Sequence, residues 1–124
     1  MYDTIAGRST LDELQGPDAA ATLLEFVAQQ APGLDDWILG AVFGGTYQRA
    51  GLSLRDRQLL NLGALTALGG VEPQLEGHLR TCLRIGMTPA ETAEALVHLV
   101  PYVGLPRSMA ALRALHAVTG EAPS

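Results

Sequence analysis

The sequence contains no lysine, and all eight of its positively charged residues are arginines. Schiff-base catalysis needs a lysine amine, so pyridoxal-phosphate enzymes and lysine-dependent aldolases are excluded. A Walker-type phosphate loop is excluded as well, because a lysine is part of that motif. The net charge is −5 and the arginines form no run, whereas nucleic-acid binding requires clustered positive charge. We therefore expect no nucleic-acid partner.

Cysteine and long hydrophobic runs are also scarce. Cys82 is the only cysteine, so the chain can form neither an internal disulfide nor a Cys-x-x-Cys redox pair. No run of about 18 apolar residues occurs, and the first residues lack the apolar core of a signal peptide. We expect a cytoplasmic protein that does not enter a membrane. The three histidines and thirteen acidic residues show no spacing typical of a metal site, and we expect none.

Charged residues make up only 17% of the 124 residues, against 48% hydrophobic residues. This length supports one domain with a real core and is too short for two. So little charge is unusual for a small monomer. We therefore expect part of the surface to be buried against further copies of the chain.

Hydrophobic residues recur with helical spacing, and no segment alternates as a strand would. The pattern predicts an all-α fold, a compact bundle of about six helices. We expect an N-terminal arm or short helical start over residues 1–16, one helical domain over residues 17–120 and a tail over residues 121–124. Helix starts are expected at Asp18, Asp35 or Asp36, Ser53, Pro73, Thr88 and Pro106.

Glycine and proline predict where these helices end or bend. Gly69-Gly70 and Gly86 should each stop a helix, and Pro101 should kink or end the helix that begins after Thr88. Gly40, Gly44 and Gly45 fall within one predicted helix. They indicate either close contact with another backbone or a break near Gly44-Gly45.

His78 is the first candidate for chemistry. It lies on or beside the apolar stripe of Leu75, Leu79 and Cys82, and a neutral imidazole there can give or take a proton near pH 7. The alternative is a buried histidine held by one backbone hydrogen bond. Cys82 follows His78 by one helical turn, so a nucleophile–base pair is conceivable, but we expect a buried thiol that serves as a small hydrophobic residue.

Glu94, His98 and Tyr102 form a second candidate group. Their spacing of four residues places them on one helix face, provided that Pro101 does not break the helix first. A carboxylate can orient the imidazole, and a phenol can donate a hydrogen bond to a developing oxyanion. The alternative is a solvated surface pair of Glu94 and His98.

Several segments together resemble one family. They are GLSLRDRQLL, ALGG, a lone histidine in EGHLR, GMTPAE and PYVGLP, spread over roughly residues 43–117. This pattern is similar to the carboxymuconolactone decarboxylase family, within the larger alkylhydroperoxidase-D-like group. The resemblance implies the helical fold of that group and assembly into trimers or hexamers.

The resemblance also implies roles for particular residues. The peroxidase branch of the group carries a Cys-x-x-Cys pair whose places are taken here by Val71 and Gln74, so dithiol peroxidase activity is not expected. The decarboxylase branch, active in aromatic catabolism, needs no cysteine, metal or cofactor. By this resemblance Arg57 would bind a substrate carboxylate, Tyr102 would shape the pocket and donate to an enolate oxygen, and His78 would act as acid or base.

Departures from the family pattern bear on the substrate. Gly45 stands where an acidic residue is common, Tyr47 replaces a tryptophan, Ala50 replaces a proline, and Met109 replaces a small amide. We expect a lyase acting on a carboxylated lactone or a related small anion, with catalytic His78 and Tyr102 and substrate-binding Arg57 and His98. The alternatives are a lactone-transforming enzyme with a different substrate and a non-catalytic oligomeric binding protein. Arg57 has its own alternative, an ion pair with Asp56 or contact with a helix end.

Overall fold

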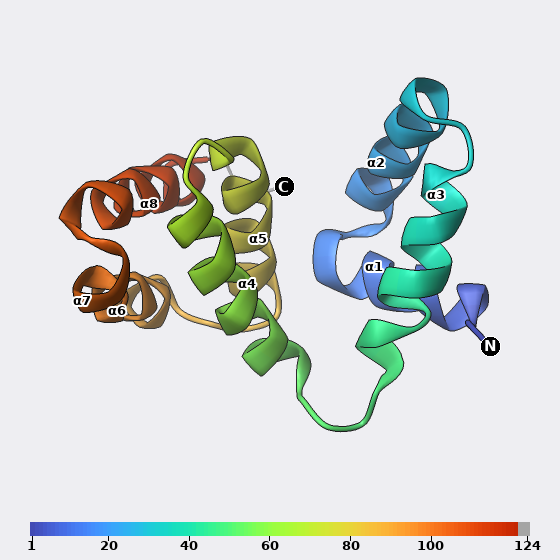
Figure 1. The fold of residues 1–124 in the computed structure, drawn as a ribbon, viewed down its shortest axis with the longest axis horizontal. Coiled ribbons are helices and arrows are strands. Elements are labelled where there is room, and N and C mark those ends of the chain that lie inside the picture. The colour runs from blue at the N-terminus through green and yellow to red at the C-terminus, as the bar shows by residue number, and fades with distance from the viewer. Residues whose placement is uncertain (122–124) are drawn as a thin grey trace. The chain divides into compact units, whose positions relative to one another are not determined.

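A computed structural model describes residues 1–121, and all regular structure in this range is helical. The predicted all-α fold class is confirmed (Figure 1). Single-turn helices α3 and α7, a π-helix (η1) and a 3-10 helix (η2) connect longer helices. The described range contains α1 (Thr4–Gln15), α2 (Pro17–Gln30), α3 (Leu34–Trp37), η1 (Ile38–Phe43), η2 (Thr46–Gln48), α4 (Leu54–Leu68), α5 (Glu72–Arg84), α6 (Pro89–His98), α7 (Val100–Val103) and α8 (Leu105–Thr119).

The chain separates into two compact units, residues 1–53 and residues 54–124. The residues expected to form an arm or a short helical start make helix α1, which contacts α2 and η1 within the first unit. A single domain over residues 17–120 stays a prediction. The expected tail over residues 121–124 lies outside the described residues except for Glu121, which forms an ion pair with Arg80 at 2.6 Å.

Two helix starts in the first unit were predicted wrongly. Asp18 was expected to cap α2, but Gly16 turns the chain with a φ of 89° and Pro17 takes the first helical position. Asp35 and Asp36 likewise lie inside the first turn of α3, because Gly33 precedes that helix with a φ of 94°. In both cases a glycine with positive φ turns the chain directly before the helix, so the helix begins there and the acidic residue falls inside its first turn.

Glycine brings α1 into backbone contact with η1. A Cβ atom on Gly7 would overlap the carbonyl oxygen of Leu39 and the amide nitrogen of Gly44, and a Cβ on Gly44 would overlap the carbonyl of Asp3. The Asp3 amide donates a hydrogen bond to the Gly44 carbonyl at 3.0 Å. Regular helix ends at Phe43. Both parts of the glycine prediction, close backbone contact and a break, are therefore confirmed for Gly44.

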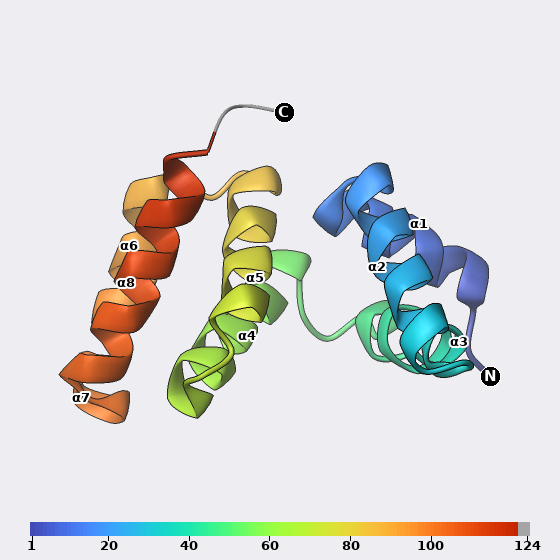
Figure 2. The ribbon, with the colours of Figure 1, turned by 90° about the horizontal axis from the view of Figure 1, so that it is seen from above.

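The second unit is built on α5, which packs against both α4 and α8 (Figure 2). Helix α8 also packs against α6. The stop at Gly69-Gly70 is confirmed, because both residues have positive φ and α5 begins two residues later at Glu72. The core of this unit is formed by Leu62, Leu75, Leu79, Cys82, Met87, Leu96, Ala111, Ala114, Leu115 and Val118.

Helix α6 begins and ends as predicted. Thr88 Oγ1 accepts a hydrogen bond from the Glu91 amide at 3.0 Å, and the Thr88 amide donates to Glu91 Oε1 at 3.1 Å. This reciprocal pair satisfies donors that the first helical turn would otherwise leave unpaired. The helix ends at His98, and Pro101 falls in the first turn of the short helix α7.

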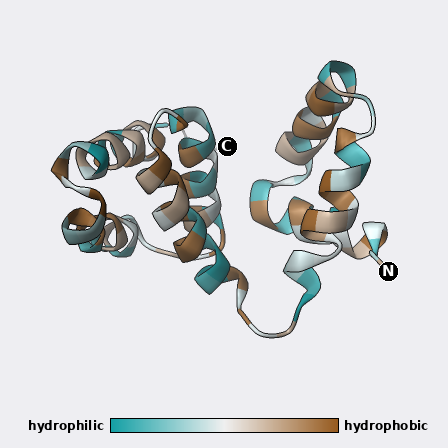
Figure 3. Ribbon diagram, viewed as in Figure 1, coloured by the Kyte–Doolittle hydropathy of each residue, from teal (hydrophilic) through white to brown (hydrophobic). Residues whose placement is uncertain are grey.

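Helix α4 is only partly buried. Leu60 and Leu68 are exposed, and hydrophobic and hydrophilic residues alternate along the helix in Figure 3. Its buried stripe is formed by Gln58, Leu62 and Thr66, two of which are polar. None of the helices within residues 1–121 combines the length and hydrophobicity that crossing a bilayer requires.

We predict that Gly7→Ala destabilises the first unit by about 1–3 kcal/mol, because the added methyl group meets backbone atoms that have no room to move. The matched control is Gly77→Ala in α5. A Cβ at Gly77 meets nothing within 4 Å, so this change should stabilise the protein by about 0.4–1 kcal/mol. Trp37 lies in the first unit, so its fluorescence during urea unfolding reports that unit, and the loss of helical circular dichroism reports both units. Equal midpoints for Gly7→Ala and the parent chain would contradict the close contact.

Candidate functional site

Helix α5 carries His78 beside its buried stripe. Leu75, Leu79 and Cys82 are buried as predicted, while His78 is half-buried at the edge of the stripe. Burial raises the pKa of the Cys82 thiol to about 11, so the thiol stays protonated at neutral pH. A protonated thiol is a poor nucleophile, and Cys82 therefore serves as a small apolar residue of the core.

The imidazole of His78 is hydrogen-bonded to a side chain of α4. Its Nδ1 lies 2.9 Å from Oε1 of Gln58, a residue only 1% exposed. In this orientation of the Gln58 amide the oxygen can only accept, which assigns the proton to Nδ1 and the lone pair to Nε2. Asn61 Nδ2 also donates to the same Gln58 oxygen, at 3.5 Å, which helps to hold the amide in this orientation.

Burial sets the charge of this histidine. Desolvation disfavours the imidazolium form and lowers the pKa of His78 below its ordinary value. The ring is therefore neutral near pH 7. With Nδ1–H directed at Gln58, the lone pair on Nε2 is the atom that can take up a proton, and an anion placed beside it would make that uptake easier.

His98 and Tyr102 form a separate pair. His98 is the last residue of α6 and Tyr102 lies in α7, and their ring centroids are 5.5 Å apart with the planes inclined by 39°. Both side chains are exposed, as is Glu94 one turn earlier. Within residues 1–121, no hydrogen bond or ring contact joins His78 to His98 or Tyr102. The expected roles of these residues stay predictions.

Arg57 is the neighbour in sequence of the histidine's partner. It is half-buried in the first turns of α4 and directly precedes Gln58, the partner of His78. Its position next to this pair is compatible with contact to an anion bound near the imidazole, and that role also stays a prediction.

Sequence reasoning did not identify Gln58. The alternative for His78 was a single backbone hydrogen bond, but the partner is a side-chain amide from the neighbouring helix. One signal was available: Gln58 stands four residues before Leu62, on the stripe that faces the core. A polar residue on such a stripe requires a hydrogen-bond partner, because burying an unpaired amide is costly.

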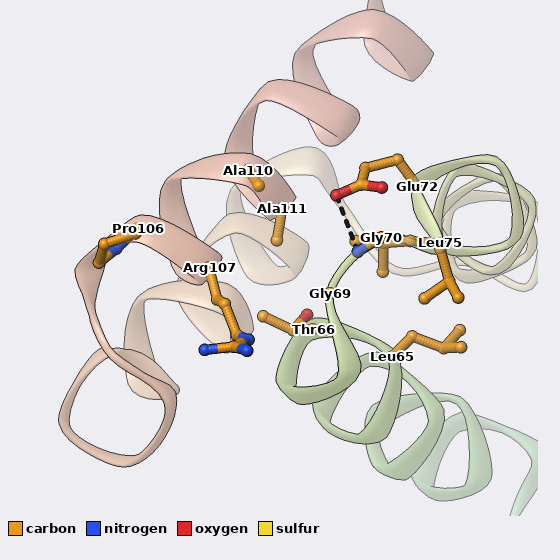
Figure 4. A pocket seen from close by; sticks show the side chains of 11 residues that line it. Leu65, Thr66, Gly69, Gly70, Glu72, Leu75, Pro106, Arg107, Ala110 and Ala111 are labelled. Atoms are coloured by element: carbon orange, nitrogen blue, oxygen red, sulfur yellow. Dashed lines mark hydrogen bonds between the residues drawn. The ribbon is translucent and has the colours of Figure 1, made fainter.

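A cavity of about 340 Å³ lies elsewhere in the second unit, between the end of α4 and the starts of α5 and α8 (Figure 4). Its polar lining groups are Thr66, Glu72 and Arg107, and the four predicted site residues are not among its wall residues. In the part of the chain that the structure describes, His, Cys, Asp and Glu side chains nowhere gather in threes in a way suited to a metal ion.

Comparison with known proteins supports the resemblance. Residues 32–117 match the model of the carboxymuconolactone decarboxylase family. A 4-carboxymuconolactone decarboxylase from Acinetobacter baylyi is 40% identical over 70 residues, which cover 56% of this chain and 52% of that protein. An uncharacterised 15.0 kDa protein from the nqo9–nqo10 intergenic region of Paracoccus denitrificans is 39% identical over 80 residues, covering 64% and 60%. The chain thus spans 52–60% of the length of these curated relatives.

We predict that the free energy of unfolding falls as the pH drops below about 6.5, the ordinary pKa of histidine. The pKa of His78 is lowered in the folded state, so the unfolded chain binds the proton more readily and acid favours unfolding. In His78→Asn, the new amide can still donate to Gln58 but does not titrate. The free energy of unfolding of this variant should therefore depend less on pH below about 6.5. Urea denaturation between pH 5 and 8 measures the difference. His116→Asn, at an exposed histidine of α8, is the control, and an equal loss of acid sensitivity there would contradict the prediction.

Proposed function

The chain belongs to the carboxymuconolactone decarboxylase family, and from this premise we propose that it is a cofactor-independent carbon–carbon lyase. Its substrate would be a small carboxylated lactone or a related anion, released in aromatic catabolism in the cytoplasm. The observation that carries the proposal is the His78–Gln58 pair. It supplies a neutral imidazole, held in one tautomer, with a lone pair available on Nε2.

The proposed reaction breaks the bond between the substrate carboxylate and its carbon. CO2 leaves, and the electron pair passes into the conjugated lactone carbonyl to give a dienolate. A proton must then be added to carbon, so each turnover consumes one proton. His78 begins neutral, and the negative charge of the bound substrate raises its proton affinity. It therefore takes a proton from solvent and delivers it to the dienolate.

Arg57 and Tyr102 would act on the two anionic parts of the substrate. A guanidinium binds a carboxylate through two parallel hydrogen bonds, which suits Arg57 to hold the substrate. A phenol can stabilise an enolate oxygen by donating a hydrogen bond, which suits Tyr102. His98 lies against the ring of Tyr102 and would contact the substrate beside it. The substitutions at Gly45 and Met109 favour a substrate that differs from the lactone of the relative from Acinetobacter baylyi.

A second function is supported by the exposed apolar side chains of the second unit. Leu60, Val97, Leu105 and Met109 are exposed on helices α4, α6 and α8. In this proposal further copies of the chain cover these side chains. The alternative to the enzyme is therefore a non-catalytic oligomeric binding protein, in which the His78–Gln58 pair only joins α4 to α5.

We predict that His78→Asn lowers turnover at least 100-fold, because general acid–base catalysis contributes rate factors of this order. Asparagine retains the hydrogen bond to Gln58, so the melting temperature should stay close to that of the parent chain. The assay follows CO2 release from 4-carboxymuconolactone and from related carboxylated lactones. His116→Asn is the matched control and should leave turnover unchanged. Full turnover in His78→Asn, or no turnover of any such lactone by the parent chain, would contradict the proposal.

We also predict that the protein sediments as a trimer or hexamer at micromolar concentration, because the exposed apolar side chains are covered on assembly. Analytical ultracentrifugation measures this directly. A monomer across the micromolar range would contradict the oligomer and leave the proposed chemistry to be judged on the turnover assay alone.

A further inference from the structure

We propose that the cavity between α4, α5 and α8 binds a small carboxylate with a compact apolar body, at a site separate from His78. The proposal does not depend on decarboxylase activity, and it would hold equally for a binding protein. It rests on a cationic side chain and apolar walls that meet at one place in the second unit.

Arg107 supplies the charge. Its side chain extends from the first turn of α8 toward Thr66 at the end of α4, as Figure 4 shows. The guanidinium passes close to the backbone of Gly69, where a Cβ atom would lie 3.2 Å from Arg107 Nε. Within residues 1–121, Arg107 forms no ion pair or hydrogen bond. Its planar array of donors suits a carboxylate, which can accept two of them at once.

Thr66 also lines the cavity, on the side toward which Arg107 extends. Its side chain is only 2% exposed, and its Oγ1 is buried without a hydrogen-bond partner among the described residues. An oxygen that water does not reach is not reached by a ligand oxygen either, so Thr66 contributes apolar wall. Arg107 is therefore the group that holds the carboxylate.

The remaining walls fix the character of the ligand. They are mostly apolar and come from all three helices and the α4–α5 turn: Leu65, Val71, Leu75, Pro106, Ala110 and Ala111. Such a lining accommodates a hydrocarbon body and leaves orientation to a few polar groups. The cavity also lies at the N-terminal ends of α5 and α8, helices of 13 and 15 residues whose dipoles favour negative charge there.

Glu72 limits the charge that the cavity accepts. Its Oε1 accepts a hydrogen bond from the Gly70 amide at 3.3 Å, drawn as the dashed line in Figure 4. The carboxylate of Glu72 repels a second negative charge on that side. The ligand is therefore expected to carry one carboxylate, directed at Arg107 and away from Glu72.

The cavity and His78 lie at different heights on α5. Leu75, the wall residue nearest to His78 in sequence, lies three residues before it, a rise of about 4.5 Å, and Glu72 lies six residues before it, about 9 Å. Gln58, the partner of His78, lies eight residues before Thr66 on α4, about 12 Å away. The two sites therefore lie at different levels of the same helix pair, and a ligand at one need not touch the other.

Benzoate is the probe for this site, and benzamide is its neutral counterpart of nearly equal shape. Calorimetric titration of the full chain should show millimolar binding of benzoate and at least tenfold weaker binding of benzamide. Arg107→Gln should weaken benzoate binding at least tenfold, and Arg113→Gln, an exposed arginine further along α8, should leave it unchanged. Glu72→Gln should strengthen binding, because it removes a like charge and retains an acceptor for the Gly70 amide.

Thr66→Val is a second control, within the cavity wall. Valine has nearly the shape of threonine and removes the unpaired hydroxyl, so the melting temperature without ligand should rise by roughly 2–5 °C. Benzoate binding should be unchanged, because the hydroxyl that is removed does not face the cavity. The proposal is overturned if benzoate shows no saturable binding in the millimolar range, or if benzylammonium binds better. It is also overturned if binding depends on Arg57 or His78 and not on Arg107.

Discussion

The contact between α4 and α5 is the interaction on which both candidate sites depend. Gly69 and Gly70 adopt positive φ and turn the chain, so that two consecutive helices lie side by side. Helix α4 packs against α5 and also contacts α8 and α6. At one level Gln58 meets His78, and at another Thr66 forms part of the wall of the cavity that Arg107 also lines. One two-glycine turn therefore positions the His78–Gln58 pair and part of the cavity wall.

Local chemistry predicted most of the helix boundaries in the second unit. The capping box of Thr88 and Glu91 and the stop at Gly69-Gly70 involve only residues near each other in the chain, so the sequence contains the information needed to place them. The caps at Asp18 and Asp35 or Asp36 were predicted wrongly for a related reason. Each helix begins directly after a glycine with positive φ, so the acidic residues fall inside the first turn and not at the cap.

The sites depend on contacts between distant residues, and the sequence contained less information about these. His78 was recognisable from its place on the helix, but its partner Gln58 lies twenty residues earlier on another helix. Arg107 followed a predicted helix start and gave no local signal that it faces the end of α4. Helical spacing identifies which residues share one face of a helix. It does not identify which other helix packs against that face, because the angle at which helices cross depends on all the packed side chains together.

Polar residues on the buried face of α4 also have a consequence for how the helices are aligned. An apolar stripe of leucines alone would tolerate a shift of α4 by one turn along α5, since one leucine replaces another. With Gln58 on the stripe, such a shift would separate its amide from the imidazole and leave both without a partner in a dry contact. The hydrogen bond between Gln58 and His78 therefore favours one register of α4 against α5. We expect selection to retain a polar partner at position 58 even in relatives whose substrate has changed.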